Sequence, residues 1–187
     1  MTIVYQKGDL FENIQPGDCI IHVVNDRGLM GSGFVVPLMK HFPQIKKQYL
    51  KWFNTPKDQD FMRGCTGDLE LGHVQCVWFH AKRHEDGAFR MMEYYPTCRE
   101  HETILVCNMV GQHGVVGPDN PTPIDYNALQ RCLYRVDEQC CSPYRRIIGP
   151  LLGSGLAGGH WPTIANIINA ALRPRQVTIF HLNNIPE

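Results

Sequence analysis

Hydrophobic and polar positions divide the chain into short apolar runs and longer segments in which apolar residues recur at helical spacing. Short runs rich in β-branched and aromatic residues, bounded by glycine or polar residues, indicate strands. We expect strands at residues 2–6, 19–24, 73–81, 103–110, 146–152 and 176–182. The second run is almost continuously apolar, as is typical of a strand covered on both faces.

Amphipathic segments lie between these runs. We expect helices at residues 33–42, 43–53, 125–140 and 162–172. The first two are separated at Pro43, because proline removes a helical hydrogen bond. The third carries Leu129, Leu133 and Val136 on one face. Strands that alternate with helices predict the α/β class, here a three-layer α/β/α domain with a central mixed sheet.

The whole chain, residues 1–187, is expected to form one domain, because it contains no internal repeat, linker or low-complexity segment. A chain of this length buries a substantial core. The polar segment at residues 82–102 separates two expected strands and could hold an added hairpin at residues 89–95. We interpret this segment as an insertion.

Composition and charge exclude several classes of protein. Hydrophobic residues make up 43% of the chain, far above the disordered range. The 18 Lys and Arg residues balance 18 Asp and Glu residues, so no overall field favours nucleic acid or an anionic membrane. No apolar run reaches the roughly 20 residues that span a bilayer, and the N-terminus lacks a signal-peptide pattern. Eight cysteines without secretory features indicate reduced thiols, and we expect a cytoplasmic protein.

One glycine-rich turn, GSGLAGG at residues 153–159, matches the dinucleotide-binding pattern G-x-G-x-x-G. That interpretation requires an acidic residue about 20 positions later, but no Asp or Glu lies between Glu138 and Glu187. The turn is also followed by only one expected strand. The sequence therefore excludes a dinucleotide fold.

A second glycine-rich turn, at residues 24–34, also follows an expected strand and precedes an expected helix. Loops at the carboxyl ends of strands line the crevice where open α/β sheets bind ligands. Backbone N–H groups in such turns, together with a helix start, favour phosphate. Two such loops facing each other suit a diphosphate.

Five segments resemble the macrodomain family. They are GDLF at residues 8–11, IHVVNDRGLMGSGF at 21–34, CNMVGQHG at 107–114, GPLLGSGLAGGHW at 149–161 and TIFHL at 178–182. The similarity is greatest to the stand-alone branch that contains ADP-ribose 1''-phosphate phosphatases and bacteriophage-encoded proteins. The resemblance implies a macrodomain fold and a groove for ADP-ribose. It also implies the host cytosol as the location if a phage encodes the chain.

The resemblance also implies individual binding roles. Asp9 would accept a hydrogen bond from the adenine amino group, although an aspartate in a turn can instead cap the backbone. Phe180 would stack near adenine, although a phenylalanine in a strand is more often a core residue. Asn25 would reach the distal ribose, and the two glycine loops would hold the diphosphate through backbone amides. The full set of substrate-binding candidates is Asp9, Leu10, Asn25, Gly28, Met30, Gly31, Ser32, Gly33, Gln112, Leu152, Gly153, Ser154, Gly155, Leu156, Ala157, Gly158 and Phe180.

The catalytic candidates implied by the resemblance are His22, Asn25 and His113. A histidine near neutral pKa activates water or protonates a leaving group. His22 lies in an otherwise apolar strand, so a hydrogen-bonded core histidine is the alternative. His113 lies in a loop, and the alternative is that it is a surface residue without a catalytic role.

Two departures from related branches bear on the reaction. A glycohydrolase branch has an aspartate, paired with a lysine nucleophile, at the position of Ala157. Another branch carries a second asparagine at the position of Gly28. Both differences weaken a glycohydrolase or deacylase assignment and leave the phosphatase branch or simple binding.

A zinc site in the insertion is an alternative use of several histidines. His80, His84, Cys98 and His101 have ligand-like spacing. If the segment folds as a hairpin, its two ends could meet. Pairs of this kind also arise by chance in a chain with nine histidines.

Three functions remain open from the sequence. The leading hypothesis is a hydrolase that acts on the group at C1'' of ADP-ribose, either a 1''-phosphate or an ADP-ribosylated protein or nucleic acid, without metal or organic cofactor. The second is a reader that binds or sequesters ADP-ribose without turnover. The third, a nucleic-acid-binding protein, is disfavoured by the balanced charge.

Overall fold

The architecture follows from a computed structural model that describes residues 3–55, 65, 67–92, 99–140 and 145–186. The strands are β1 (Ile3–Lys7), β2 (Cys19–Asn25), β3 (Val74–His80), β4 (Thr103–Gln112), β5 (Ile147–Gly149) and β6 (Val177–His181). The α-helices are α1 (Val35–His41), α2 (Ile45–Asn54), α3 (Tyr126–Arg135) and α4 (Trp161–Ala171). Short 3-10 turns occur at η1 (Leu10–Glu12) and η2 (Glu100–Glu102), and a π-helical segment, η3 (Val136–Cys140), extends α3.

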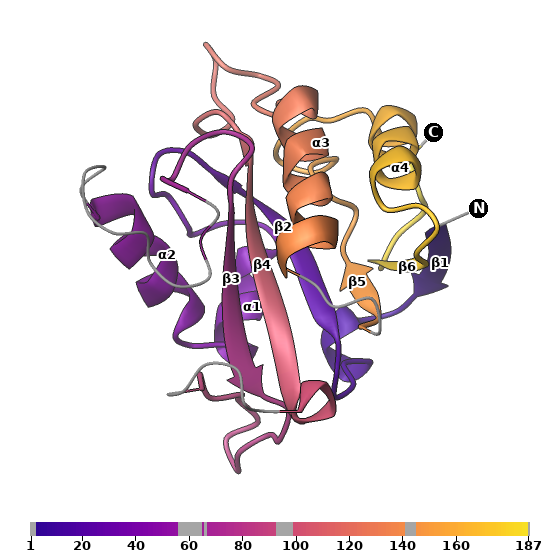
Figure 1. The fold of residues 1–187 in the computed structure, drawn as a ribbon. Helices are drawn as coiled ribbons and strands as arrows, with labels where there is room; N and C mark the ends of the chain where they lie inside the picture. The colour runs from indigo at the N-terminus through magenta and orange to yellow at the C-terminus, as the bar shows by residue number, and fades with distance from the viewer. Residues whose placement is uncertain (1–2, 56–64, 66, 93–98, 141–144, 187) are drawn as a thin grey trace.

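The strands pair into one sheet in the order β1-β6-β5-β2-β4-β3 (Figure 1). All neighbours pair in parallel except β3, which runs antiparallel to β4. The predicted mixed sheet is therefore confirmed. Because five strands point the same way, their carboxyl ends and the loops that follow them meet along one edge.

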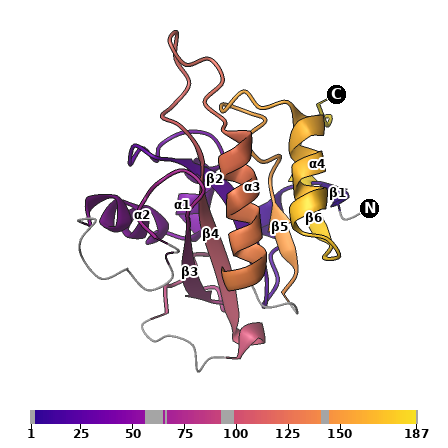
Figure 2. The same cartoon turned by 45° about the horizontal axis from the view of Figure 1, so that its top comes forward.

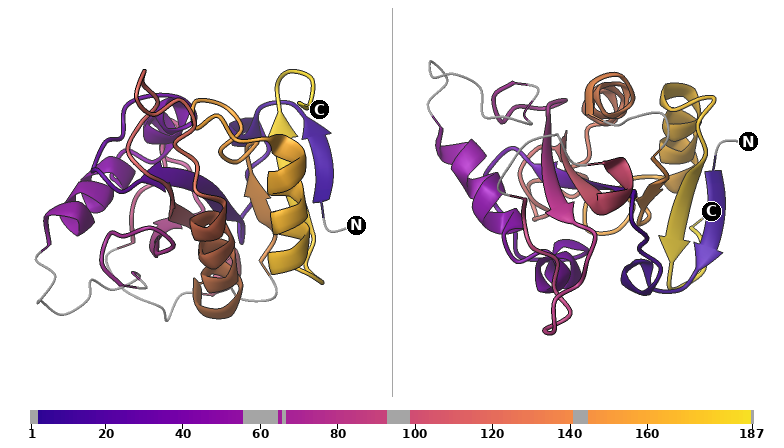
Figure 3. Two further views of the ribbon diagram at one scale, coloured as in Figure 1. Left: turned by 90° about the horizontal axis from the view of Figure 1, so that it is seen from above. Right: turned by 60° about the horizontal axis from the view of Figure 1, so that its bottom comes forward.

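Helices cover both faces of this sheet. Alternate residues of a strand point to opposite faces, and β2 shows this clearly. Cys19 and Ile21 pack in the cluster beneath α3 and α4, whereas Ile20 and Val24 pack in the cluster beneath α1 and α2. Figure 2 shows α3 and α4 next to each other on one face, and Figure 3, seen from above, shows α1 and α2 on the other. The chain thus has the predicted three-layer α/β/α arrangement.

The predicted elements correspond to the observed ones within a few residues, with one exception. Residues 146–152 were expected to form a strand, but β5 ends at Gly149. Pro150 has no N–H with which to continue the ladder. A Cβ at Gly149 would also lie 2.8 Å from the Ile21 carbonyl oxygen, so this position favours glycine. The break releases residues 150–160 into the long glycine loop.

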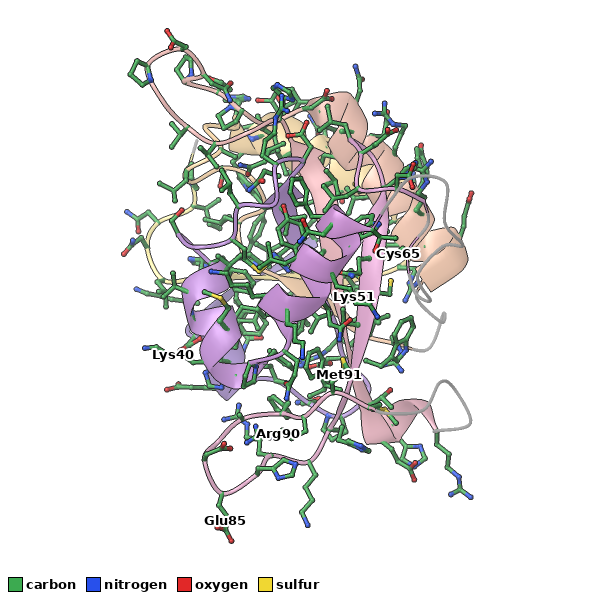
Figure 4. The ribbon with its side chains drawn as sticks, turned by 90° about the vertical axis from the view of Figure 1, so that its left-hand side faces the viewer. Lys40, Lys51, Cys65, Glu85, Arg90 and Met91 are labelled. Carbon is green, nitrogen blue, oxygen red and sulfur yellow. The ribbon has the colours of Figure 1, made fainter. Side chains whose placement is uncertain are left out.

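The segment at residues 82–102 connects β3 to β4 and projects from the end of the sheet opposite to the loop that precedes α3 (Figure 1). Its chain returns along β3, where Met92 N donates to Trp78 O at 3.0 Å and His80 N donates to Arg90 O at 2.9 Å. Figure 4 shows Glu85 and Arg90 on the projecting part of this segment, away from Lys51 on α2. Residues 90–92 therefore pair with β3, and the hairpin expected at residues 89–95 stays a prediction, because residues 93–98 lie outside the described part.

Two further sequence-based expectations concern metal and membrane. Cys98, one of the four suggested zinc ligands, lies outside the described residues. Among the residues that are described, no group of three or more His, Cys, Asp or Glu side chains could hold a metal ion. Within the same part of the chain, no helix has the length and apolar character needed to cross a bilayer.

Candidate functional site

The two glycine loops lie against each other. They follow β2 and β5, which are neighbouring parallel strands. A Cβ added at Gly33 would lie 3.2 Å from Cδ1 of Leu156, so the first loop touches the second. Gly33 has φ +69°, in the left-handed region that favours glycine. The predicted convergence of the two loops is present.

Three cavities adjoin along this edge of the sheet. A cavity of about 500 Å³ lies beside β1 and β6, where the resemblance predicts the adenine site, and we call it the adenine-end cavity for that prediction. The central cavity, of about 240 Å³, shares Phe34, Pro150 and Leu151 with it. The distal cavity, of about 110 Å³, shares Ser32 and Gln112 with the central one. Together they form one continuous groove, which we call the crest groove.

The adenine-end cavity is lined by both predicted adenine-contacting residues, Asp9 and Phe180, and by the binding candidate Leu10. Asp9 lines it and also caps η1, because its Oδ1 accepts a hydrogen bond from Phe11 N at 2.9 Å. The capping alternative is therefore realised, and the second carboxylate oxygen still has acceptor capacity. Leu10 and Phe180 are each only 4% exposed, so both are core residues whose surfaces form the cavity wall.

The diphosphate candidates divide between the three cavities. The central cavity is lined by Ser32, Gly33, Gln112, Leu152, Gly153, Gly155, Leu156 and Ala157. Gly31 lines the distal cavity, and Ser154 lines the adenine-end cavity. No Lys or Arg lines the central cavity among the described residues. Any anion held there would therefore depend on backbone N–H groups.

His22 lies under the central cavity and is 1% exposed. The ring of Phe34 lies beside it, tilted by 50° and with 5.8 Å between ring centroids. His22 Nε2 is 2.6 Å from Asn108 Oδ1, whereas His22 Nδ1 is buried without a hydrogen-bond partner in the described structure. A histidine that served only the core would leave a costly unsatisfied nitrogen here. This favours the interpretation in which Nδ1 meets a ligand or water.

A row of buried polar side chains fixes the tautomer of His22. His22, Asn108 and Gln75 are direct partners across β2, β4 and β3. Gln75 Nε2 donates to the Gln48 carbonyl oxygen at 2.9 Å, and Asn108 Nδ2 donates to Gln75 Oε1 at 2.8 Å. The Gln48 carbonyl can only accept, so it orients both amides and leaves Asn108 Oδ1 as an acceptor. The proton of His22 therefore sits on Nε2, and Nδ1 carries a lone pair.

Burial controls the charge of His22. Loss of hydration lowers its pKa to about 4, against smaller opposing effects of the hydrogen bond to Asn108 and of the backbone at Val23. The Val23 backbone does not meet the geometry of a hydrogen bond to Nδ1, so Nδ1 is unpaired in the described structure. His22 is therefore neutral at physiological pH and can accept a proton at Nδ1. It is a weak base until a nearby anion raises its pKa.

This pKa gives the first testable prediction. Between pH 6.5 and pH 4 the unfolded chain protonates at His22 while the folded protein does not, so the free energy of unfolding falls as the pH drops. The expected loss from this residue alone is about 3 kcal/mol. Chemical denaturation of the wild type and of His22→Gln measures it. The variant should lose less stability over the same range, and parallel curves for the two proteins would contradict the buried neutral histidine.

Asn25 lines the distal cavity but turns its amide into its own loop. Its Oδ1 accepts hydrogen bonds from Arg27 N at 2.9 Å and Leu29 N at 3.1 Å, and its backbone carbonyl accepts one from the Tyr49 hydroxyl at 2.5 Å. Its Nδ2 donates to the Leu29 carbonyl. In this conformation the side-chain oxygen and nitrogen of Asn25 are both used within the protein, so neither is free for the predicted contact with a ribose. Asn25 holds the shape of the first glycine loop.

Three predicted binding residues do not line the crest groove. Gly28 has φ +70° and packs against the ring of Phe53, where a Cβ would lie 2.6 Å from Cδ1. Met30 is 4% exposed and packs in the core beneath α1 and α2. Gly158 has φ +67° and faces the Pro121 carbonyl oxygen, which would lie 2.9 Å from an added Cβ. These residues shape the two loops from behind.

His113, a catalytic candidate, also lies apart from the groove. Its side chain is 57% exposed, and its Nδ1 lies 2.7 Å from Oδ2 of Asp26. Asp26 Oδ1 also accepts a hydrogen bond from Gly114 N at 2.8 Å. His113 therefore joins two loops on the surface and is not among the residues that line the groove. The surface alternative holds for this histidine.

Sequence reasoning missed Phe34, Gln75 and Asn108. Phe34 comes directly after Gly33 in the sequence, and this position next to a predicted binding loop could have indicated that it lines the groove. Gln75 and Asn108 are polar residues inside apolar runs, as His22 is. Their alignment depends on the register of three strands, which the sequence pattern does not specify.

No protein-family model matches the chain. An uncharacterized 17.5 kDa protein from the tk-vs intergenic region of Enterobacteria phage T4 is 25% identical over 183 residues, covering 96% of each chain. A solved protein of unknown function from Bacteroides thetaiotaomicron is 29% identical, with a TM-score of 0.70 over 96% of this chain and 98% of that one. A macrodomain protein from Streptomyces coelicolor is 27% identical, with a TM-score of 0.64 over 96% and 98% of the two chains.

A more distant structure shares the fold alone. Thermosipho africanus DarTG, solved in complex with ADP-ribose, is 16% identical and has a TM-score of 0.63. The superposition covers 96% of this chain and 42% of that one.

Proposed function

The chain is a macrodomain, and on that premise we propose that its crest groove binds ADP-ribose or a derivative and that it hydrolyses the group on the terminal ribose. The observation that carries the proposal is the direct contact of the two glycine loops above His22. This contact makes a single site from two segments more than 100 residues apart in the sequence. The DarTG complex with ADP-ribose supports the ligand class.

The proposed ligand lies extended along the groove. Adenosine occupies the adenine-end cavity, where Asp9 accepts from the adenine amino group and Phe180 forms part of the wall. The diphosphate occupies the central cavity, where the glycine loops supply N–H donors. The terminal ribose lies in the distal cavity beside Asn25 and Gln112.

In the proposed reaction on a 1''-phosphate, water attacks phosphorus and the bond between phosphorus and the C1'' oxygen breaks. With an ADP-ribosylated group, water instead attacks C1'' and the bond from C1'' to that group breaks. His22 Nδ1 accepts the proton of this water and then passes it to the leaving atom. The bound diphosphate is an anion close to His22 and raises its pKa, which makes Nδ1 a stronger base in the complex. Phe34 lies beside the ring in the free protein, and its displacement by the ligand is part of the proposal. The chemistry uses side chains and loop amides of this chain, with no cofactor.

The resemblance implies ADP-ribose 1''-phosphate as the substrate, and ADP-ribose attached to a protein or nucleic acid is the other hydrolytic candidate. The second function is binding without turnover. The 1% exposure of His22 favours it, because a catalytic base must reach water. We also propose a cytoplasmic location, which rests on the sequence alone: eight cysteines in a chain without secretory features.

Calorimetric titration tests the ligand assignment. ADP-ribose is expected to bind at least about tenfold more tightly than AMP or ribose 5-phosphate, because each of these fills only part of the groove. Incubation with ADP-ribose 1''-phosphate and with an ADP-ribosylated peptide, followed by product analysis, then separates hydrolase from reader. Equal affinity for AMP and ADP-ribose would contradict the extended pose.

A further inference from the structure

The segment at residues 82–102 has no role in the proposed function, yet one of its side chains contacts the wall of the crest groove. Arg83 is exposed, and its Nη2 donates a hydrogen bond to the carbonyl oxygen of Phe11 in η1. Phe11 is 3% exposed and lines the adenine-end cavity. The segment projects from the far end of the sheet, but Arg83 ties it to a residue that forms the proposed adenine site.

The part of this segment that carries Arg83 is anchored in the core. Phe89 is 2% exposed, and its ring stacks on that of Phe42 with 4.9 Å between centroids. Its backbone N donates to the His41 carbonyl oxygen at 2.7 Å. Cζ of Arg83 lies 5.1 Å from the centre of the Phe89 ring, which favours a cation over its face. Arg83 therefore links a buried anchor to η1.

Phe11 connects Arg83 to two groups that shape the adenine-end cavity. Its backbone N donates to Oδ1 of Asp9 at 2.9 Å, while its carbonyl accepts from Arg83. Its ring stacks on Phe34 at 5.4 Å and on His41 at 4.6 Å between centroids. Asp9 is exposed, and an exposed carboxylate that lacks a fixed partner samples several rotamers. The direction of the Asp9 carboxylate therefore depends on how firmly the Phe11 backbone is held.

We propose that Arg83 is a positioning residue for recognition of the adenine base, so that the segment at residues 82–92 sets the base selectivity of the groove. The inference rests on the proposed function, which places the adenine amino group at Asp9. Arg83 fixes the Phe11 backbone, and the Phe11 N–H fixes one oxygen of Asp9. The second oxygen then accepts from the amino group in a defined direction. Without Arg83 the carboxylate keeps its charge but loses this pre-organisation.

Calorimetry with ADP-ribose, AMP and purine riboside 5'-monophosphate tests the inference, because the last compound lacks the amino group. The wild type is expected to bind AMP about tenfold more tightly than purine riboside 5'-monophosphate, and Arg83→Ala should reduce this ratio about fivefold. A merely structural contact would weaken both nucleotides equally and leave the ratio unchanged. Because Arg83 is exposed, its replacement should leave the melting temperature close to that of the wild type. Lys82→Ala removes the neighbouring exposed cation and is the matched control, which should keep the wild-type ratio.

Histidine NMR of the free protein gives a readout that does not depend on a ligand. Burial and then the charge of Arg83 lower the pKa of His41, whereas the charge of Asp9 raises it. In Arg83→Ala the pKa of His41 should therefore rise, and in Lys82→Ala it should stay at the wild-type value. An unchanged pKa in Arg83→Ala would mean that the guanidinium group is not held at η1, and this overturns the inference.

The binding experiment separates the inference from the proposed function. An unchanged ratio in Arg83→Ala overturns the inference, even if both nucleotides bind more weakly. If the wild type binds ADP-ribose but does not prefer AMP to purine riboside 5'-monophosphate, the inference fails while the proposed function stands. If the wild type does not bind ADP-ribose, the proposed function fails and the inference fails with it.

Discussion

Replacement of His22 by alanine is expected to reduce hydrolysis by about 100-fold or more and to leave ADP-ribose affinity within about threefold. The residue lies beneath the central cavity and contributes no exposed surface to binding, so its removal should affect turnover far more than affinity. The lone pair on Nδ1 is what the reaction would lose. Steady-state kinetics with the substrate found by the product analysis, together with calorimetry, measures both quantities.

A second variant separates chemistry from stability. His22→Gln keeps a donor toward Asn108 and fills most of the ring volume, but it has no basic nitrogen. It should show the same loss of turnover with a smaller fall in melting temperature than His22→Ala. His84→Ala, in the segment opposite the groove, is the control and should behave as wild type. Wild-type turnover in either His22 variant would rule out this histidine as the base and leave binding as the function.

The tautomer of His22 provides a test that does not depend on activity. Nitrogen NMR of the free protein should show a protonated Nε2 and an unprotonated Nδ1, because the Gln48 carbonyl orients the amides of Gln75 and Asn108. On addition of ADP-ribose, the pKa of His22 should rise from about 4, since the diphosphate is an anion beside a neutral base. A proton on Nδ1 in the free protein would remove the basis for the proposed mechanism.

Much of the fold was accessible from the sequence because burial on both faces leaves a strong pattern. The run at residues 19–24 is apolar because β2 lies between two helical layers, and the break at Pro43 separates α1 from α2 as expected. The glycine loops were also accessible. Gly33 and Gly153 have φ of +69° and +65°, which is why glycine stands at these positions.

The contacts that determine what each candidate side chain can bind depend on how loops and strands pack against one another. Asn25 was expected to face a ribose, but two backbone N–H groups of its own loop occupy its side-chain oxygen. His113 was expected near the distal end, but the carboxylate of Asp26 holds it at the surface. Neither contact follows from residue type or spacing, because each depends on how a loop closes onto its neighbour.

The second large effect is expected at Gly155, which lines both the adenine-end and the central cavity. A Cβ at this position would meet no atom within 4 Å, and its φ is outside the left-handed region, so a side chain should not disturb the fold. In Gly155→Glu the new carboxylate enters the groove where the diphosphate is proposed to lie. Two unit charges about 5 Å apart at an effective dielectric constant of about 20 repel by about 3 kcal/mol. ADP-ribose affinity should therefore fall by more than about 100-fold.

Gly117 provides a matched control. A Cβ there would also meet no atom within 4 Å, and Gly117 does not line any cavity of the groove. Gly117→Glu introduces the same charge and should bind ADP-ribose as the wild type does, with an unchanged melting temperature. Gly155→Gln isolates the charge, because it fills the same space and should recover part of the affinity. The repulsion acts only if the pyrophosphate passes over Gly155, so full binding by Gly155→Glu would mean that the ligand takes another path across the sheet.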